Sequence, residues 1–215
     1  MYGELLEDRP RPETRTRARE RPRVGDRRLL LLETTLQLIA EQGIDAVTHR
    51  AVAEAAGVSL GSTTYWFASR QEMLREALVH FARLEIAMVH DHLDPILGER
   101  LSRKQLVERF VALLAPQLGP DRWRTVAQYA FLQEAARQPE LEPVCREWTE
   151  AWRSALAELF DSLGVAHPAL EAQMFLAMLD GLFLSELAAP DDDFETTVLR
   201  PALRTWFQRI PGGKR

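Results

Sequence analysis

Apolar residues recur every three or four positions along most of the chain after residue 26, which is the spacing of one face of an α-helix. In the first such segment Leu29, Leu32, Leu36 and Ile39 share a face, and Gly43 closes the segment as a helix cap. No stretch alternates between apolar and polar residues as a half-buried strand does. The pattern therefore predicts an all-α protein of about nine helices. Proline and glycine separate the later helices, which we expect at about 101–116, 121–137, 140–163, 168–188 and 193–209.

Two of the predicted helices are unusually short. Thr48 stands at an N-cap position before the first, and Gly57 ends it. The stretch GVSLGSTTYWF follows, and its threonines and aromatics favour a strand by propensity although its neighbours are helical. Ser69, with Glu72 three residues later, has the pattern of a capping box and begins a long fourth helix that we expect to reach Pro95. A helix, a tight turn and a second helix form a helix-turn-helix, whose short helices depend on their neighbours.

The turn of this unit has the residues that such a turn requires. Gly57 can adopt the left-handed conformation, Val58 fills the corner, and Ser59 can cap the next helix. That next helix carries no charge, and its small or flat groups have hydrogen-bonding edges. Such groups can reach base edges and thymine methyls in the major groove of DNA. The predicted base-reading helix therefore contains Gly61, Ser62, Thr63, Thr64 and Tyr65.

The charge distribution also favours a nucleic-acid partner, although the net charge of the chain is −5. Residues 9–28 contain nine arginines against three carboxylates, whereas residues 76–215 contain 15 basic and 21 acidic residues. A positive end on a negative body is typical of a protein that contacts a polyanion with one end. We expect residues 1–23 to form a disordered arginine-rich arm, and a tail that serves only solubility is the alternative interpretation.

The segment from Arg27 to Leu74 resembles the DNA-binding domain of the TetR family of bacterial transcriptional regulators. The resemblance is carried by LLETTLQLIAEQGIDAVTHRAVAEAAGVSLGSTTYWFASRQEML. It implies a helix-turn-helix DNA-binding domain at 24–68 and a larger helical domain for effector binding and dimerisation at 69–215. It also implies that Thr48 and Arg70 contact phosphates. The DNA-binding residues implied by the resemblance are Thr48, His49, Arg50, Leu60, Gly61, Ser62, Thr63, Thr64, Tyr65, Trp66 and Arg70.

Two positions depart from the family pattern. Leu60 replaces a residue that is frequently lysine in the family, and Thr64 stands where many members have tyrosine. The operator sequences of relatives therefore do not predict the one that this chain binds. The arginine-rich arm is a candidate for replacing the phosphate contact that is lost at Leu60. Phe67 is expected in the core, whereas the interpretation of Trp66 is divided between packing and the DNA backbone.

A helix-turn-helix of this kind binds as a dimer, so the chain needs a self-complementary surface. Small residues recur every four positions on the predicted helix at 168–188 and allow another helix to approach closely. The last helix adds an apolar face, which Pro201 should kink or deprive of a hydrogen bond. The resemblance implies a four-helix bundle, and packing within one subunit is the alternative. The predicted interface residues are Ala177, Gly181, Ser185, Val198, Ala202 and Trp206.

The middle helices are rich in aromatic residues and methionine, as a mostly apolar effector pocket would be. For any single member of this set, the core is the competing interpretation. Polar residues on apolar helix faces, Asp180 among them, are candidates for orienting a ligand. The predicted effector-binding residues are Met88, His92, Trp123, Gln128, Phe131, Glu134, Trp148, Trp152, Met174 and Met178.

Other chemistries find no support in the sequence. Cys145 is the single cysteine, so a disulfide is excluded and a zinc or redox pair is not supported. The histidines of HDH (90–92) point in different directions on a helix and cannot share an ion, so we expect no metal site and no cofactor. The N-terminus lacks the pattern of a signal peptide and no apolar run could span a bilayer, so we expect a cytoplasmic protein.

The sequence therefore predicts a ligand-responsive repressor that binds a palindromic operator as a dimer. A small-molecule effector, expected to be largely apolar, would move the fourth helix and so change the separation of the two recognition helices. One alternative is a DNA-binding regulator without an effector. Another is an all-helical enzyme that acts on an apolar ligand, although no acid and base groups occur at a fixed spacing. Effector, operator, regulated genes and the sign of regulation are left open.

Overall fold

Residues 24–210 are described by the computed structural model, so the predicted arginine-rich arm at 1–23 lies outside the described residues. Within this range every regular element is helical, and the all-α prediction with nine α-helices is confirmed. The α-helices are α1 (Val24–Gln42), α2 (His49–Ala55), α3 (Leu60–Trp66), α4 (Arg70–Leu93), α5 (Arg103–Leu114), α6 (Arg122–Ala135), α7 (Glu142–Ser162), α8 (Pro168–Ala188) and α9 (Arg200–Arg209). Short 3₁₀ turns η1 (Ile44–Ala46), η2 (Asp94–Ile96) and η3 (Ala115–Leu118) and a π turn η4 (Glu195–Leu199) join some of them.

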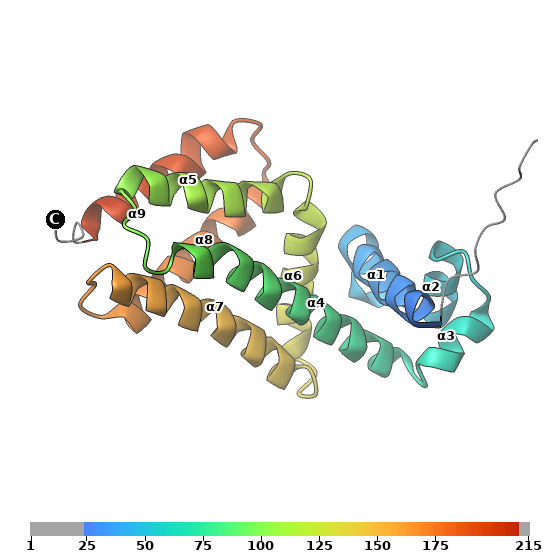
Figure 1. The fold of residues 1–215 in the computed structure, drawn as a ribbon. Coiled ribbons are helices and arrows are strands. Elements are labelled where there is room, and N and C mark those ends of the chain that lie inside the picture. The colour runs from blue at the N-terminus through green and yellow to red at the C-terminus, as the bar shows by residue number, and fades with distance from the viewer. Residues whose placement is uncertain (1–23, 211–215) are drawn as a thin grey trace, which may run out of the picture.

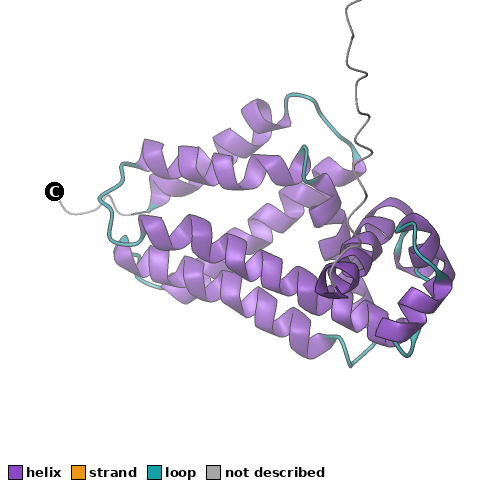
Figure 2. Cartoon of the chain, turned by 45° about the vertical axis from the view of Figure 1, so that its right-hand side comes forward, coloured by secondary structure: helices purple, strands orange, loops and turns teal. Residues whose placement is uncertain are grey.

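Helices α1 to α3 form a cluster at one end of the molecule, and α5 to α9 form a larger group at the other (Figure 1). Helix α4 runs from the first group into the second, where α7 lies along it. Helix α6 packs against α1, and α7 packs against both α4 and α8 (Figure 2). Two elements therefore connect the groups: α4 by continuity of the chain and α6 by its contact with α1.

Burial of a few side chains holds the short helices in place. Val52 of α2 and Phe67, just after α3, are at most 1% exposed and belong to the same core cluster as Leu36 of α1 and Met73 of α4. Gly57 has φ of +65°, the left-handed conformation that the turn requires. The segment around α3 is therefore helical against its propensity because tertiary packing outweighs it.

The predicted helix caps are present in part. Thr48 Oγ1 accepts a hydrogen bond from Ala51 N at 3.1 Å and caps α2. Ser69 Oγ accepts from Glu72 N at 3.1 Å and caps α4, but the Glu72 carboxylate accepts from Ala68 N and not from Ser69 N. Of the two hydrogen bonds of the expected capping box, the one to Ser69 Oγ is therefore present, and the Glu72 carboxylate bonds to the preceding residue instead.

Two further caps differ from the sequence-based expectation. Ser59 occupies the N-cap position of α3, but its hydroxyl lies 3.1 Å from Ser62 Oγ and makes no side-chain bond to the helix backbone. A complete capping box starts α5 instead, where Ser102 and Gln105 each bond to the other's backbone N–H. We did not predict this second box, although its Ser-x-x-Gln spacing is the sequence signal for one.

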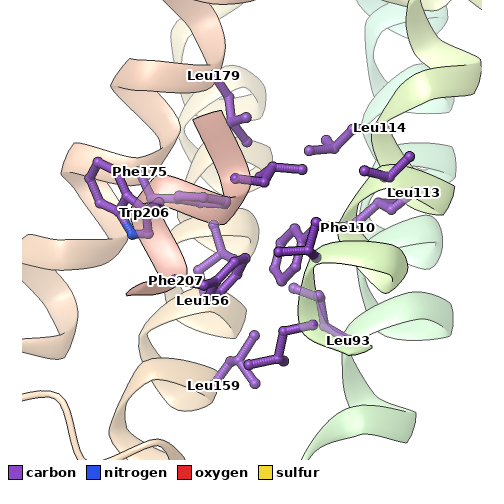
Figure 3. Close-up of a cluster of buried hydrophobic side chains, with 14 of the residues drawn as sticks. Leu93, Phe110, Leu113, Leu114, Leu156, Leu159, Phe175, Leu179, Trp206 and Phe207 are labelled. Atoms are coloured by element: carbon purple, nitrogen blue, oxygen red, sulfur yellow. The ribbon is translucent and has the colours of Figure 1, made fainter. Parts of the chain in front are cut away.

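Aromatic side chains from α5, α8 and α9 form the core of the larger group (Figure 3). The Phe175 ring lies 5.3 Å from that of Phe110 and 5.4 Å from that of Trp206, measured between centroids. Trp206 is only 8% exposed. Its prediction as a dimer-interface residue is therefore wrong, since its surface is already covered within the subunit.

Pro201 lies within the last predicted helix, just after a π turn. The π turn η4 ends at Leu199, and Pro201 lies in the first turn of α9. Proline has no backbone N–H to donate, and its missing bond to the residue four positions earlier falls within the π turn. The helix predicted at 193–209 is therefore present from residue 194 to residue 209, with a π turn before Pro201, and the side chains of Leu203 and Phe207 are buried.

Candidate DNA-binding surface and effector cavity

Helix α3, which the sequence predicts as the recognition helix, exposes an uncharged surface. Leu60 is 50% exposed and Tyr65 is 76% exposed, and Gly61 and Thr64 are also exposed. The Tyr65 ring stands edge-on to the Trp66 ring at 5.0 Å between centroids. Trp66 itself is half-buried against the core, so it supports Tyr65 from behind. This arrangement presents the Tyr65 hydroxyl and the Thr64 hydroxyl to the outside of the domain.

Thr63 does not take part in this surface. It is fully buried, and its hydroxyl donates to the Leu60 carbonyl at 2.8 Å and approaches the His49 carbonyl at 3.3 Å. Thr63 therefore ties α3 to α2, and the prediction that it faces bases is wrong. Seven residues make barely two turns, and the position that turns inward is set by where α2 packs.

Arg70 also has a role other than the one expected. Its Nε donates to the Val47 carbonyl and its Nη2 to the Ile44 carbonyl, both at 2.7 Å. The Asp45 carboxylate lies 3.7 Å from Nη2. These bonds hold the η1 segment that leads into Thr48, so Arg70 positions that segment instead of presenting a free guanidinium to a phosphate.

The start of α2 lies beside α3 and carries the remaining predicted contacts. Thr48 and Arg50 are exposed, whereas His49 is half-buried and its carbonyl faces Thr63. Arg50 therefore supplies a positive charge next to the uncharged surface of α3.

A cavity of about 160 Å³ opens between the helices of the larger group. Three of the residues predicted for effector binding line it, namely Gln128 of α6 and Trp148 and Trp152 of α7. Asp180 of α8 also lines it, as its place on an apolar helix face suggested. The remaining lining residues are Leu114, Gln117, Leu132, Thr149, Leu176, Leu179 and Phe183.

The other predicted effector-binding residues lie elsewhere. Phe131 is fully buried and packs against Phe81 at 6.0 Å between ring centroids, so it belongs to the core. Met88 and Met178 pack against the core cluster around Phe110, and Met174 is 50% exposed. None of these four predicted side chains lines the cavity, because the apolar faces that carry them turn toward other helices or toward solvent.

Three polar or aromatic predictions also fall outside the cavity. His92 is exposed, and its Nδ1 lies 2.9 Å from the Met88 carbonyl one turn earlier on α4. Glu134 accepts a hydrogen bond from Gln138 and is buried at the end of α6. Trp123 is half-buried against the core cluster that α1 and α4 share.

Asp180 is an acidic side chain of the cavity that is both partly buried and hydrogen-bonded. The Tyr129 hydroxyl donates to its Oδ1 at 3.0 Å, which joins α6 to α8. Burial raises the pKa of the Asp180 carboxyl, and this outweighs the opposing effect of the Tyr129 hydrogen bond. A second hollow of about 250 Å³ shares Thr149, Leu176 and Asp180 with the cavity and opens outward between α7 and α8.

A buried ion pair connects α4 and α6. Arg124 Nη2 and Nε lie 2.7 and 3.0 Å from Glu85 Oε1, and Glu85 is only 2% exposed. Desolvation raises the pKa of Glu85 more than Arg124 lowers it. This pair was not predicted from the sequence, although a glutamate between Phe81 and Val89 on the apolar stripe of α4 was a signal for a buried partner.

The predicted small-residue stripe of α8 lies on its outer side. Ala177, Gly181 and Ser185 are all exposed. Three large apolar residues of the same helix, Leu170, Met174 and Leu184, are between 46% and 56% exposed. Val198 and Ala202 are half-buried next to the core. Helix α8 therefore carries an unusual amount of exposed apolar surface for a helix of a soluble fold.

Comparison with known proteins matches both parts of the chain. The family model described as "Bacterial regulatory proteins, tetR family" matches residues 31–77, and the model "Tetracyclin repressor-like, C-terminal domain" matches residues 101–209. The HTH-type transcriptional regulator BetI of Rhizobium meliloti is 28% identical over 77% of this chain and 81% of its own length.

Solved structures agree with these matches. SCO7518 from Streptomyces coelicolor A3(2), named as a transcriptional regulator, is 30% identical with a TM-score of 0.64, over 85% of this chain and 98% of its own. The multidrug binding protein EbrR complexed with ethidium is 30% identical with a TM-score of 0.63, over 86% of this chain and 99% of its own. Among the described residues, no helix is both long and apolar enough to cross a membrane.

Proposed function

The chain belongs to the TetR family of bacterial transcriptional regulators, and we propose that it is a homodimeric repressor released from a palindromic operator by a small-molecule effector. It would act in the cytoplasm, where the operator is. The single observation that carries this proposal is the position of α6, which lines the effector cavity with Gln128 and Leu132 and also packs against α1 of the DNA-binding domain.

In this proposal α3 reads the major groove of DNA. Thr64 and Tyr65 present short hydroxyl and flat aromatic groups that suit base edges and thymine methyls. Thr48 and Arg50 at the start of α2 contact the phosphates and fix the register of α3 on the duplex. Thr63 and Arg70 act indirectly, since the one holds α3 against α2 and the other holds the segment before Thr48.

Dimerisation is assigned to the outer side of α8. Its exposed small residues allow a second copy of α8 to approach closely, and the flanking Leu170, Met174 and Leu184 supply apolar surface to bury. A two-fold axis at α8 makes the same patch serve both subunits. Half-sites one helical turn of DNA apart, or a multiple of it, then match the two copies of α3.

The effector would bind in the cavity between α5, α6, α7 and α8. Its lining is mostly apolar with a few polar groups, as ligand sites usually are. The complex of EbrR with ethidium supports a small-molecule effector, since that protein shares the fold over most of this chain.

Two routes lead from the cavity to the DNA-binding domain. Helix α6 contacts α1 directly. In addition, Arg124 on α6 is hydrogen-bonded to Glu85 on α4, and α4 begins just after Ser69, next to α3. Displacement of α6 by an effector therefore acts on both helices that carry the DNA-binding domain. This adds α6 to the prediction that the effector moves the fourth helix, and it couples two sites through one movable element.

Selection of DNA by the full-length protein tests the proposal. Fragments recovered from a random-sequence pool are expected to contain inverted repeats, and sedimentation of the complex should give a multiple of two chains per site. A recovered sequence without internal symmetry, bound by a single chain, would refute the dimeric operator model. The same fragments then allow release by small molecules to be measured.

A further inference from the structure

The effector cavity contains one unbalanced charge. Of the residues that line the cavity itself, Asp180 alone has an acidic side chain, and none is basic. The outward hollow adds Glu150 and Arg153, but these two side chains are paired with each other. The net charge of the residues that line the two spaces together is therefore the single negative charge of the Asp180 carboxylate.

Asp180 has room for a second partner. The Tyr129 hydroxyl bonds to Oδ1, and none of the hydrogen bonds within residues 24–210 engages Oδ2. Because Asp180 lines both the inner cavity and the outward hollow, its carboxylate stands where the two meet. A molecule that occupies both spaces would therefore lie beside this group.

Two tryptophans also line the cavity. Trp148 and Trp152 are four residues apart on α7 and therefore share one face of that helix. Indole rings attract cations through their electron-rich faces, more strongly than other aromatic side chains. A partly desolvated carboxylate together with two indoles favours a positive charge and disfavours a negative one.

We propose that the effector is an organic cation with a small apolar body, which pairs its charge with Asp180 and packs its body against Trp148 and Trp152. This assignment rests on the proposed function, because it names the chemical class of the effector for the same cavity. The volume of about 160 Å³ is close to that of a cavity that holds one benzene molecule. A single-ring body fits the inner cavity, and a longer substituent would extend into the outward hollow.

Three probes of equal size and different charge test the assignment. Benzylammonium, benzyl alcohol and benzoate are titrated into the full-length protein at pH 7.5, and binding is followed by tryptophan fluorescence and calorimetry. We expect benzylammonium to bind at least ten-fold more tightly than benzyl alcohol, with benzoate weakest. Equal affinity for the cation and the alcohol, or no measurable binding of the cation at millimolar concentration, would overturn the proposal.

Variants separate charge from shape. Asp180→Asn keeps an oxygen for the Tyr129 hydroxyl and should bring the affinity for benzylammonium to within two-fold of that for benzyl alcohol. Asp161→Asn removes an exposed carboxylate at the end of α7, away from the cavity lining, and should change nothing. Thr149→Lys adds a cation at the exposed rim, so it should weaken the binding of benzylammonium and strengthen the binding of benzoate. If both Asp180→Asn and Thr149→Lys left the order of the probes unchanged, the carboxylate would not be the determinant.

Release from the selected DNA fragment is measured separately by fluorescence anisotropy. A cation that binds in an Asp180-dependent way without releasing DNA would refute the effector role and leave the charge assignment intact. Conversely, release by neutral or anionic compounds alone would support the regulator and refute the assignment of a cation.

Discussion

Removal of Arg124 is the most informative perturbation of this structure, because it leaves a carboxylate buried without its partner. Arg124→Met keeps most of the length of the side chain and deletes the charge that lies 2.7 Å from Glu85. At an effective dielectric constant of about 20, the direct attraction across this distance is about 6 kcal/mol. The raised pKa of Glu85 indicates that desolvation offsets this attraction within the native pair.

The cost of the substitution follows from the protonation of Glu85. Without Arg124, the buried carboxyl can avoid its charge by taking up a proton, so the cost of protonation limits the electrostatic part of the penalty. From an ordinary value of 4.5, protonation at pH 7 costs about 3.4 kcal/mol, at 1.36 kcal/mol per pH unit, and at pH 5 about 0.7 kcal/mol. A raised pKa in the folded state favours folding at low pH, and this advantage is lost as the pH rises. Arg124→Met should therefore destabilise the protein by about 3 kcal/mol at pH 7 and by less than about 1 kcal/mol at pH 5.

Urea unfolding followed by circular dichroism measures these differences, at a fixed protein concentration so that the proposed dimerisation affects every variant equally. Arg146→Met is the matched control, since Arg146 is 74% exposed and its pairing with Glu142 is a surface contact worth less than about 1 kcal/mol. The double variant Glu85→Leu, Arg124→Met removes both charges and should recover most of the lost stability. Equal destabilisation at both pH values, or no recovery in the double variant, would refute the reasoning.

Three shorter predictions concern other parts of the molecule. Tyr65→Ala should reduce the discrimination between the selected operator and random duplex by roughly 1–3 kcal/mol in a binding titration. Thr63→Val should instead lower the unfolding free energy by about 1 kcal/mol and change base preference only indirectly. Gly181→Glu places a charge on the exposed stripe of α8 and should shift sedimentation from dimer to monomer; an unchanged dimer would exclude α8 as the interface. Burial raises the pKa of the Cys145 thiol to about 11, so at pH 7.5 iodoacetamide should label native protein far more slowly than urea-unfolded protein.

Much of the fold was predictable because its signals are local. The three- and four-residue spacing of apolar side chains is a property of each helix by itself, and it predicted the nine helices. Thr48 and Gly57 act on the backbone within three residues of themselves, so the helix cap and the left-handed turn could be read directly from the sequence. The family resemblance placed α3 as the recognition helix for the same reason, since its motif is a continuous run.

Which side of a helix meets which neighbour was decided by the tertiary structure. In α3 the uncharged residues differ little in polarity, so the sequence offered no reason to turn Thr63 inward and Thr64 outward. Packing of α2 against α3 made that choice. The same holds for Trp206, whose apolar ring suits a subunit core and a dimer interface equally well until Phe175 covers it.

Contacts between distant residues were beyond the reach of local patterns. Arg124 and Glu85 are 39 residues apart, and only the tertiary fold brings them together. Asp180 and Tyr129 are likewise 51 residues apart. The sequence by itself determined that this chain is helical and carries a helix-turn-helix, because those features arise within a few residues. The tertiary structure alone decided which aromatic residues form a cavity and which charge stands in it, because these depend on how separate helices pack.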